Sequence, residues 1–147
     1  MSEKDKRFLG EAVMLGSLCP PSQEAFSVGC VVVDTNGSLI GSGYSREWGE
    51  GWHAEEIALE KARRDGKALM GATLYSSLEP CHPRQSGKKS CAQHIIDAGV
   101  ARVVFCMKEP PVYVDCHGQT TLQAAGLAVE QDESLQDRVK KANPGRF

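Results

Sequence analysis

The chain has 147 residues, of which 41% are hydrophobic and 24% charged, and its formal net charge is −2. This length suffices for one domain with a core of its own, and the composition is close to the globular average. The net charge and the scattered basic residues exclude a broad face for nucleic acid, and no apolar run reaches membrane-spanning length. We therefore expect neither nucleic acid nor membrane as a partner.

The predicted elements begin with a helix and a hairpin, after which helices and strands alternate. Helical spacing with Ser2 as a cap favours an amphipathic helix over a signal peptide at the N-terminus, and hence a cytoplasmic protein. Asn36-Gly37 between two β-rich runs is a strong hairpin signal. In chain order, we expect a helix over 4–18, strands over 27–34 and 38–44, a helix over 54–64, a strand over 72–80, a helix over 91–99, a strand over 101–107, a helix over 119–126, a strand over 127–131 and a helix before Pro144.

This order of elements predicts the fold class. Helical crossovers between the later strands imply parallel pairing, whereas the hairpin makes the first pair antiparallel. We expect an α/β fold, namely a three-layer α/β/α sandwich around a five-stranded mixed sheet. The chain is expected to be a single domain over residues 1–147, with a core of about 5–130 and a C-terminal tail of 131–147.

The six cysteines raise a choice between disulfides, metal ligation and burial. In a chain expected to be cytoplasmic, metal ligation or burial is favoured. Cys30 and Cys106 lie inside apolar, strand-like runs, where a thiol packs as a small hydrophobe. Cys81 follows a predicted strand, and Cys91 opens a predicted helix whose unpaired N–H groups favour a thiolate.

His53 precedes a predicted helix and, with Cys81 and Cys91, offers the nitrogen and sulfur ligands of a catalytic zinc site, which keeps one position for water. Glu55 stands two residues after His53, and positions i and i+2 do not face each other in a regular helix. If both side chains address one site, His53 lies at or just outside the helix start. A carboxylate beside the metal but not bound to it suits a proton shuttle.

The motifs His53-Ala54-Glu55 and Glu79-Pro80-Cys81, followed by Cys91, resemble the zinc-dependent cytidine deaminase superfamily, whose signature is H-x-E followed by P-C and a second Cys. The resemblance covers about residues 5–130. It implies zinc held by His53, Cys81 and Cys91, Glu55 as the catalytic residue, and a homodimer or tetramer. The alternatives are a structural zinc site and a non-catalytic, zinc-containing module that binds a nucleotide.

Nine residues separate Cys81 from Cys91 where most branches have two, and this long loop is similar to that of the pyrimidine deaminases of riboflavin biosynthesis. That resemblance implies hydrolytic deamination of a small aminopyrimidine, a nucleotide or nucleoside-like intermediate, by a stand-alone deaminase domain. The chain departs from that branch at Ala25-Phe26, where Asn-Pro is usual, and at Ser45, where His is usual. Around Phe26 it instead resembles the F-x-V-G of cytidine deaminases. Cytidine, deoxycytidylate or another nucleobase is therefore an alternative substrate.

Candidate substrate contacts lie in segments around the expected zinc site. The loop between the two cysteines offers cations for a phosphate, and its guanidinium fork makes Arg84 the first choice, before Lys88. Trp52 is expected either to stack on a heterocycle or to pack its own loop. The predicted contact residues are Phe26, Trp52, Ala54 (through its backbone N–H), Arg84, Lys88 and Asp115.

Overall fold

The structure is a computed structural model that describes residues 1–110 and 116–147. Each predicted helix and strand is present, with its ends within two residues of those expected. The helices are α1 (Glu3–Gly16), α2 (Ala54–Arg64), α3 (Cys91–Asp97), α4 (Gly118–Ala124) and α5 (Gln136–Ala142), with a 3-10 turn η1 (Glu133–Leu135) before α5. The strands are β1 (Gly29–Val33), β2 (Leu39–Tyr44), β3 (Thr73–Leu78), β4 (Arg102–Met107) and β5 (Ala128–Gln131). No helix in the two described ranges is long and apolar enough to cross a membrane.

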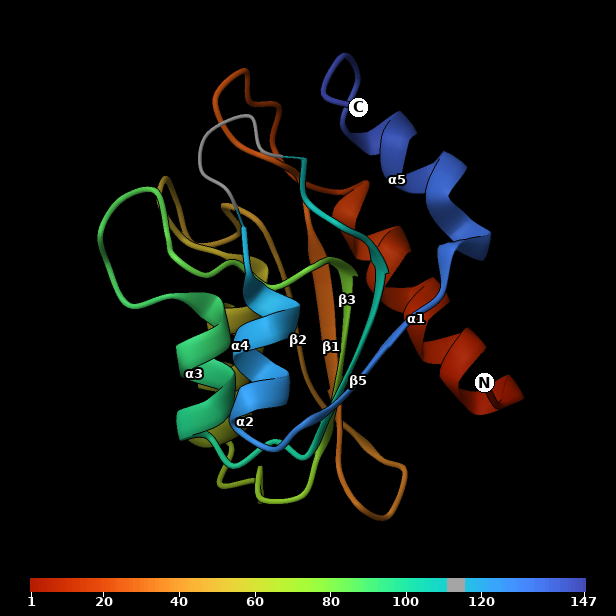
Figure 1. Cartoon of the computed structure of the whole chain (residues 1–147), viewed down its shortest axis with the longest axis vertical. Coiled ribbons are helices and arrows are strands. Elements are labelled where there is room, and N and C mark those ends of the chain that lie inside the picture. Colours follow the sequence, from red (N-terminus) through yellow and green to blue (C-terminus); the bar gives the residue numbers. More distant parts are fainter. Residues whose placement is uncertain (111–115) are drawn as a thin grey trace.

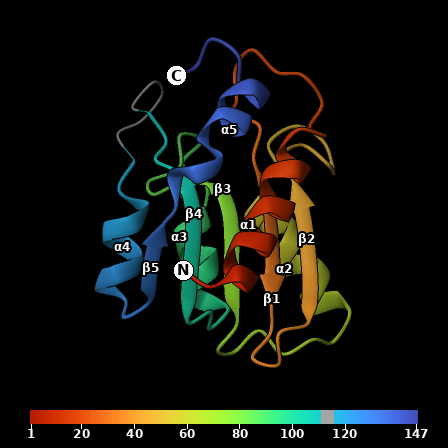
Figure 2. The same cartoon turned by 90° about the vertical axis from the view of Figure 1, so that its right-hand side faces the viewer.

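The strands form one mixed sheet in the order β2-β1-β3-β4-β5. β1 pairs antiparallel with both β2 and β3, whereas β3, β4 and β5 run parallel to one another. Figure 1 shows α2, α3 and α4 on one face of the sheet and α1 and α5 on the other, and Figure 2 looks onto the face that α1 and α5 cover. This is the predicted three-layer α/β/α sandwich. Because β3 and β4 are parallel, the segments that follow them start at the same edge of the sheet.

Each face of the sheet has its own apolar core, because successive side chains of a strand point to opposite faces. On β1, Cys30 and Val32 pack in the cluster with α2, whereas Val31 and Val33 pack in the cluster with α1. All of β1 is buried, which explains why its sequence is continuously apolar. Cys30 and Cys106 are both fully buried in these cores, as predicted.

Two glycines of β2 allow α2 to lie close against the sheet. A Cβ atom at Gly41 would meet the Ala58 carbonyl oxygen at 2.3 Å, and one at Gly43 would meet the Ala54 oxygen at 2.7 Å. A larger residue at either position would push the helix outward. The first turn of α2, and with it His53, is therefore fixed next to the sheet.

A buried carboxylate ties the start of α1 to the opposite face of the sheet. Asp5 accepts hydrogen bonds from both terminal nitrogens of Arg102 on β4, each at 2.8 Å, and from the Tyr75 hydroxyl on β3 at 2.6 Å. Ser2 caps the helix and forms a reciprocal capping box with Asp5. The hydrogen bonds from Arg102, with a contribution from Tyr75, hold the pKa of Asp5 well below its usual range.

Candidate active site

The three predicted metal ligands meet at one edge of the sheet. His53 is the N-cap of α2 in an extended conformation, so it lies just outside the helix. Cys81 follows β3, and Cys91 is the first residue of α3. The ligand atoms of the three residues all lie within 4.8 Å of one another. The Nδ1 atom of His53 is 3.1 Å from the Cys91 sulfur and 3.8 Å from the Cys81 sulfur.

This donor set fits zinc. One imidazole nitrogen and two sulfurs are ligands of known catalytic zinc sites, and the usual bond lengths separate such ligands by about 3.5–3.8 Å at a tetrahedral ion. The His53–Cys81 distance of 3.8 Å is of this size, and the His53–Cys91 distance of 3.1 Å is slightly shorter. His53, Cys81 and Cys91 can therefore hold zinc with small side-chain movements, and three protein ligands leave a fourth position for water.

The two thiols differ in acidity. The backbone N–H of Cys91 donates to the Cys81 sulfur at 3.4 Å. The hydrogen bond from the Cys91 thiol, followed by that from His53, lowers the pKa of Cys81 to about 4. The pKa of Cys91 is raised, because its thiol donates to Cys81 and is fully buried. In the absence of a metal, these contacts favour negative charge on Cys81, and the thiolate expected at Cys91 stays a prediction for the zinc-bound site.

Glu55 lies on the wall of a cavity beside this cluster. The residue is 4% exposed, and it lines the cavity together with His53 and Cys81. Burial raises the pKa of Glu55 to about 7, and the negative charge of Cys81 adds to the shift. A carboxyl group that exchanges protons near neutral pH is suited to general acid–base chemistry.

Two further carboxylates line the same cavity, although the sequence indicated little about either. Glu79 follows β3 and accepts the backbone N–H of Gln119 at 3.0 Å, which joins the start of α4 to the cavity wall. Glu109 follows β4, and burial raises its pKa to about 7. Their positions after parallel strands are the available sequence signal, because ligands bind outside the carboxyl ends of such strands.

A comparison with known families matches the part of the chain that carries the candidate ligands and Glu55. The family model for the cytidine and deoxycytidylate deaminase zinc-binding region matches residues 2–107, more than two thirds of the chain. The chain belongs to this family. The matched range includes all three candidate ligands and Glu55, so the family and the zinc cofactor predicted from the sequence motifs are confirmed.

Two similar proteins carry the name of a pyrimidine deaminase. The diaminohydroxyphosphoribosylamino-pyrimidine deaminase of Schizosaccharomyces pombe is 37% identical over 134 residues, which cover 90% of this chain and 33% of that protein. A protein of the same name from Buchnera aphidicola is 33% identical, over 86% of this chain and 83% of that protein. The chain thus spans about a third of the first relative and most of the second.

Solved structures share the fold. RibD of Acinetobacter baumannii (form 1) matches with a TM-score of 0.80 and 31% identity, over 98% of this chain and 39% of that chain. The Rib2 deaminase of Aspergillus oryzae in complex with DARIPP matches with a TM-score of 0.82 and 24% identity, over 95% of this chain and 90% of that chain. At that identity the second likeness shows the fold alone.

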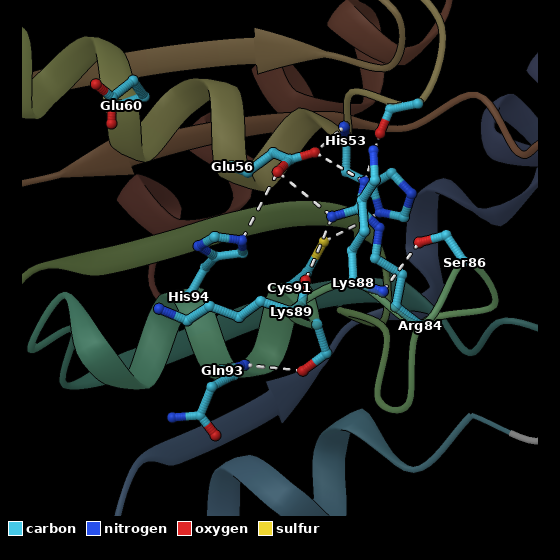
Figure 3. Close-up of polar contacts among 12 residues, drawn as sticks. His53, Glu56, Glu60, Arg84, Ser86, Lys88, Lys89, Cys91, Gln93 and His94 are labelled. Carbon is cyan, nitrogen blue, oxygen red and sulfur yellow. Dashed lines mark hydrogen bonds and ion pairs between the residues drawn. The ribbon is translucent and has the colours of Figure 1, made fainter.

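In this family member, the terminal nitrogens of Arg84 are bound by other protein groups (Figure 3). They donate to the carboxylate of Glu56 at 3.0 and 3.4 Å, to the Lys89 carbonyl oxygen at 3.3 Å and to the Gly51 carbonyl oxygen. The Nε atom is buried and has no hydrogen-bond partner in the part of the chain that the structure describes. Arg84 thus lines the cavity, but its guanidinium fork is directed at Glu56.

Lys88 and Trp52 are the predicted contacts that are both exposed and on the cavity wall. Lys88 forms no ion pair with any residue in 1–110 or 116–147, whereas its neighbour Lys89 pairs with Asp97. Trp52 is 40% exposed and packs edge-on against Trp48 at 5.2 Å between ring centroids. The two expectations for Trp52 are therefore compatible, because it packs its own loop and still presents a surface to the cavity.

The remaining predicted contacts lie in different surroundings. Phe26 lines the cavity and is 8% exposed. Ala54 is fully buried in the core and is absent from the residues found to line the cavity. Asp115 lies outside the described residues.

Arg46 also shapes the cavity, although the sequence did not single it out. Its backbone is left-handed (φ 64°), and its side chain is buried. The guanidinium donates to the carbonyl oxygens of Pro20 at 2.6 Å and Phe26 at 3.2 Å, and to the Ser27 hydroxyl at 2.8 Å. Arg46 therefore holds the loop that carries Phe26, a long-range role for which the local sequence has no signal.

Proposed function

We propose that this chain is a zinc-dependent hydrolytic deaminase of an aminopyrimidine nucleotide, of the kind for which its relatives are named. The observation that carries the proposal is Glu55, a buried carboxyl group on the cavity wall beside three zinc-compatible ligands. A purely structural zinc site needs no such proton acceptor. The names of the Schizosaccharomyces and Buchnera relatives support a phosphoribosylamino-pyrimidine as the substrate.

In the proposed reaction, His53, Cys81 and Cys91 hold the zinc. When bound, zinc would lower the pKa of a water molecule toward neutrality and so supply a nucleophile for the amine-bearing ring carbon. Glu55 takes one proton from the water and delivers it to the adjacent ring nitrogen. When the tetrahedral carbon collapses to a carbonyl, Glu55 transfers the remaining hydroxyl proton to the departing amine, which leaves as ammonia. One water is consumed, and Glu55 ends in the state in which it began.

Lys88 and Trp52 are the side chains we propose for substrate binding. The Lys88 ammonium lies at the cavity without a carboxylate partner in the described residues, so it is available for a phosphate. The exposed face of Trp52 is suited to a flat heterocycle. Arg84 is not proposed as a phosphate clamp, because Glu56 binds the guanidinium fork and neutralises its charge.

We also propose a homodimer or tetramer. Met14 near the end of α1 and Leu18 just after it, each 60% exposed, supply apolar surface that contact with a second copy would bury. Light scattering on the purified protein should give two or four times the 15.9 kDa of one chain. A monomer at micromolar concentration would contradict this proposal.

The proposed reaction is tested by ammonia release from a small substrate panel. The panel contains a diaminohydroxypyrimidine ribotide, its dephosphorylated form, cytidine and deoxycytidylate. We expect release from the ribotide, with a much lower kcat/KM for the dephosphorylated form because Lys88 loses its partner. Release from cytidine or deoxycytidylate alone would contradict the substrate class, and no release from any compound by zinc-loaded protein would contradict deamination.

A further inference from the structure

Glu56, the residue after the proposed proton shuttle, joins the segments that carry the metal ligands (Figure 3). Its side chain is 12% exposed. One carboxylate oxygen accepts the backbone N–H of His53 at 2.7 Å and a guanidinium nitrogen of Arg84 at 3.0 Å. The other oxygen lies 3.4 Å from Arg84 and 3.7 Å from Nε2 of His94 on α3. The start of α2, the 82–90 loop and α3 thus meet at one carboxylate.

Arg84 extends this junction to the segments just before His53 and just before Cys91. It donates to the carbonyl oxygen of Gly51, two residues before His53, and to that of Lys89, two residues before Cys91. Its side chain is 4% exposed, and Glu56 is the carboxylate that neutralises it. Removing one partner of a buried ion pair is strongly destabilising, because the other charge is left unpaired. Without Glu56, the favourable course for Arg84 is to move into solvent, together with its loop.

Helix capping accounts for only part of this arrangement. A glutamate three residues after the N-cap that accepts the N-cap N–H is an ordinary capping box, and it needs one oxygen and no buried arginine. Glu60, one turn later on α2, shows the contrast. It pairs with Arg63 and Arg64 of its own helix, its side chain is 30% exposed, and those pairs reach no loop.

We propose that Glu56 is a positioning residue of the metal centre. Through Arg84 it holds the 82–90 loop against the start of α2, and it thereby fixes the spacing of His53 and Cys91 and the shape of one cavity wall. Its effect on turnover rests on the proposed function, whereas its effects on zinc affinity and loop order do not.

The test compares Glu56→Gln with Glu60→Gln, a matched change on the same helix. Partners of metal ligands typically contribute 10–100-fold to metal affinity, so we expect zinc affinity in Glu56→Gln, measured by chelator competition, to fall about 10–100-fold. Hydrogen exchange in peptides covering 82–90 should become faster in the same variant. Glu60→Gln should match wild type in both measurements. If Glu56→Gln matches Glu60→Gln in both, Glu56 is a helix cap only and the proposal is overturned.

A double-mutant cycle with Arg84→Gln keeps the test decisive if Glu56→Gln folds poorly. Arg84→Gln leaves the cap on His53 intact but frees the loop, so we expect it to speed exchange in 82–90 and to weaken zinc binding. Because the two residues act as one unit, Glu56→Gln/Arg84→Gln should be no worse than the more damaging single change. Additive losses of zinc affinity would contradict the proposal.

The two proposals fail in distinguishable ways. Suppose that wild type releases no ammonia from any substrate, while Glu56→Gln loses zinc affinity and loop order. The deaminase function then fails and the positioning role stands. If wild type is active and Glu56→Gln has wild-type zinc affinity and exchange, the positioning role fails and the deaminase function stands.

Discussion

Two buried carboxylate–guanidinium pairs lie on opposite faces of the sheet, and they join different kinds of structure. On the α1 face, Asp5 binds Arg102, which belongs to a strand. On the α2 face, Glu56 binds Arg84, which belongs to the loop between two metal ligands. The first pair joins regular elements and contributes stability, whereas the second joins the segments that build the site. Damage on the α1 face should therefore lower stability and spare the site, whereas damage to the Glu56–Arg84 pair should impair the site itself.

The largest effect is expected from Cys91→Ser at the site. Even partners of metal ligands contribute 10–100-fold to affinity, so loss of a ligand should weaken zinc binding by more than about 100-fold and abolish turnover. Cys106→Ser is the control, because Cys106 is equally buried but lies in the core of the other face. It should lose stability and keep zinc. Stoichiometric zinc in Cys91→Ser, measured by atomic emission, would contradict the ligand assignment.

Asp5→Asn should have the largest effect on the α1 face. It removes the charge that binds Arg102 and accepts the Tyr75 hydroxyl, so we expect about 2–3 kcal/mol of lost stability in denaturant unfolding. Glu11→Gln, on the same helix with an exposed partner at 4.0 Å, should change stability by less than about 0.5 kcal/mol. Zinc content should be unchanged in both variants. A loss of zinc in Asp5→Asn would mean that the two faces are not independent.

Low pH should weaken the contact between Asp5 and Arg102. The folded-state pKa of Asp5 lies below its ordinary value of 3.8, so its stabilising contribution is complete above that value and is lost as pH falls through the folded-state pKa. Between pH 5 and pH 3, wild type should therefore lose more stability than Asp5→Asn, in which this group does not titrate. Parallel stability–pH curves for the two proteins would contradict the assignment.

Asn143 lies on the α1 face, but a change there is expected to have a smaller effect on the site as well. This buried side chain, at the end of α5, accepts the Ser27 N–H at 2.6 Å and donates to the Ser27 and Val139 carbonyl oxygens at 3.0 Å each. Asn143→Ala should cost about 1–2 kcal/mol and raise KM more than it lowers kcat, because the loop bearing Phe26 loosens. Gln123→Ala, on an exposed position of α4, serves as the control. An unchanged KM in Asn143→Ala would mean that α5 does not influence substrate binding at the site.

The sequence predicted the α/β/α fold and the metal centre, because both depend on local signals. Periodicity and the Asn36-Gly37 turn defined the elements, and helical geometry alone required His53 to lie outside α2 if it shared a site with Glu55. These features need only a few neighbouring residues. The antiparallel pairing of β1 with β3, by contrast, joins distant segments and was not predicted.

The surroundings of the site could not be predicted from local patterns. Arg84 looked like a substrate clamp because the sequence does not show that Glu56, 28 positions earlier, neutralises it. The low pKa of Cys81 depends on hydrogen bonds from the Cys91 thiol and from His53, which come from two other segments of the chain. Arg46 is fixed by carbonyl oxygens some 20 residues away. Each of these contacts exists only once the chain has folded.

The central claim is that His53, Cys81 and Cys91 form a zinc site in which Glu55 carries the protons. Glu55→Gln tests this claim most directly. The change keeps the size of the side chain and removes its ability to exchange a proton. We expect this variant to bind one zinc per chain, to unfold at or above the wild-type temperature because burial disfavours the charged form, and to lose about 10²–10⁴-fold in kcat for ammonia release. A zinc-loaded Glu55→Gln protein with wild-type kcat would contradict the account.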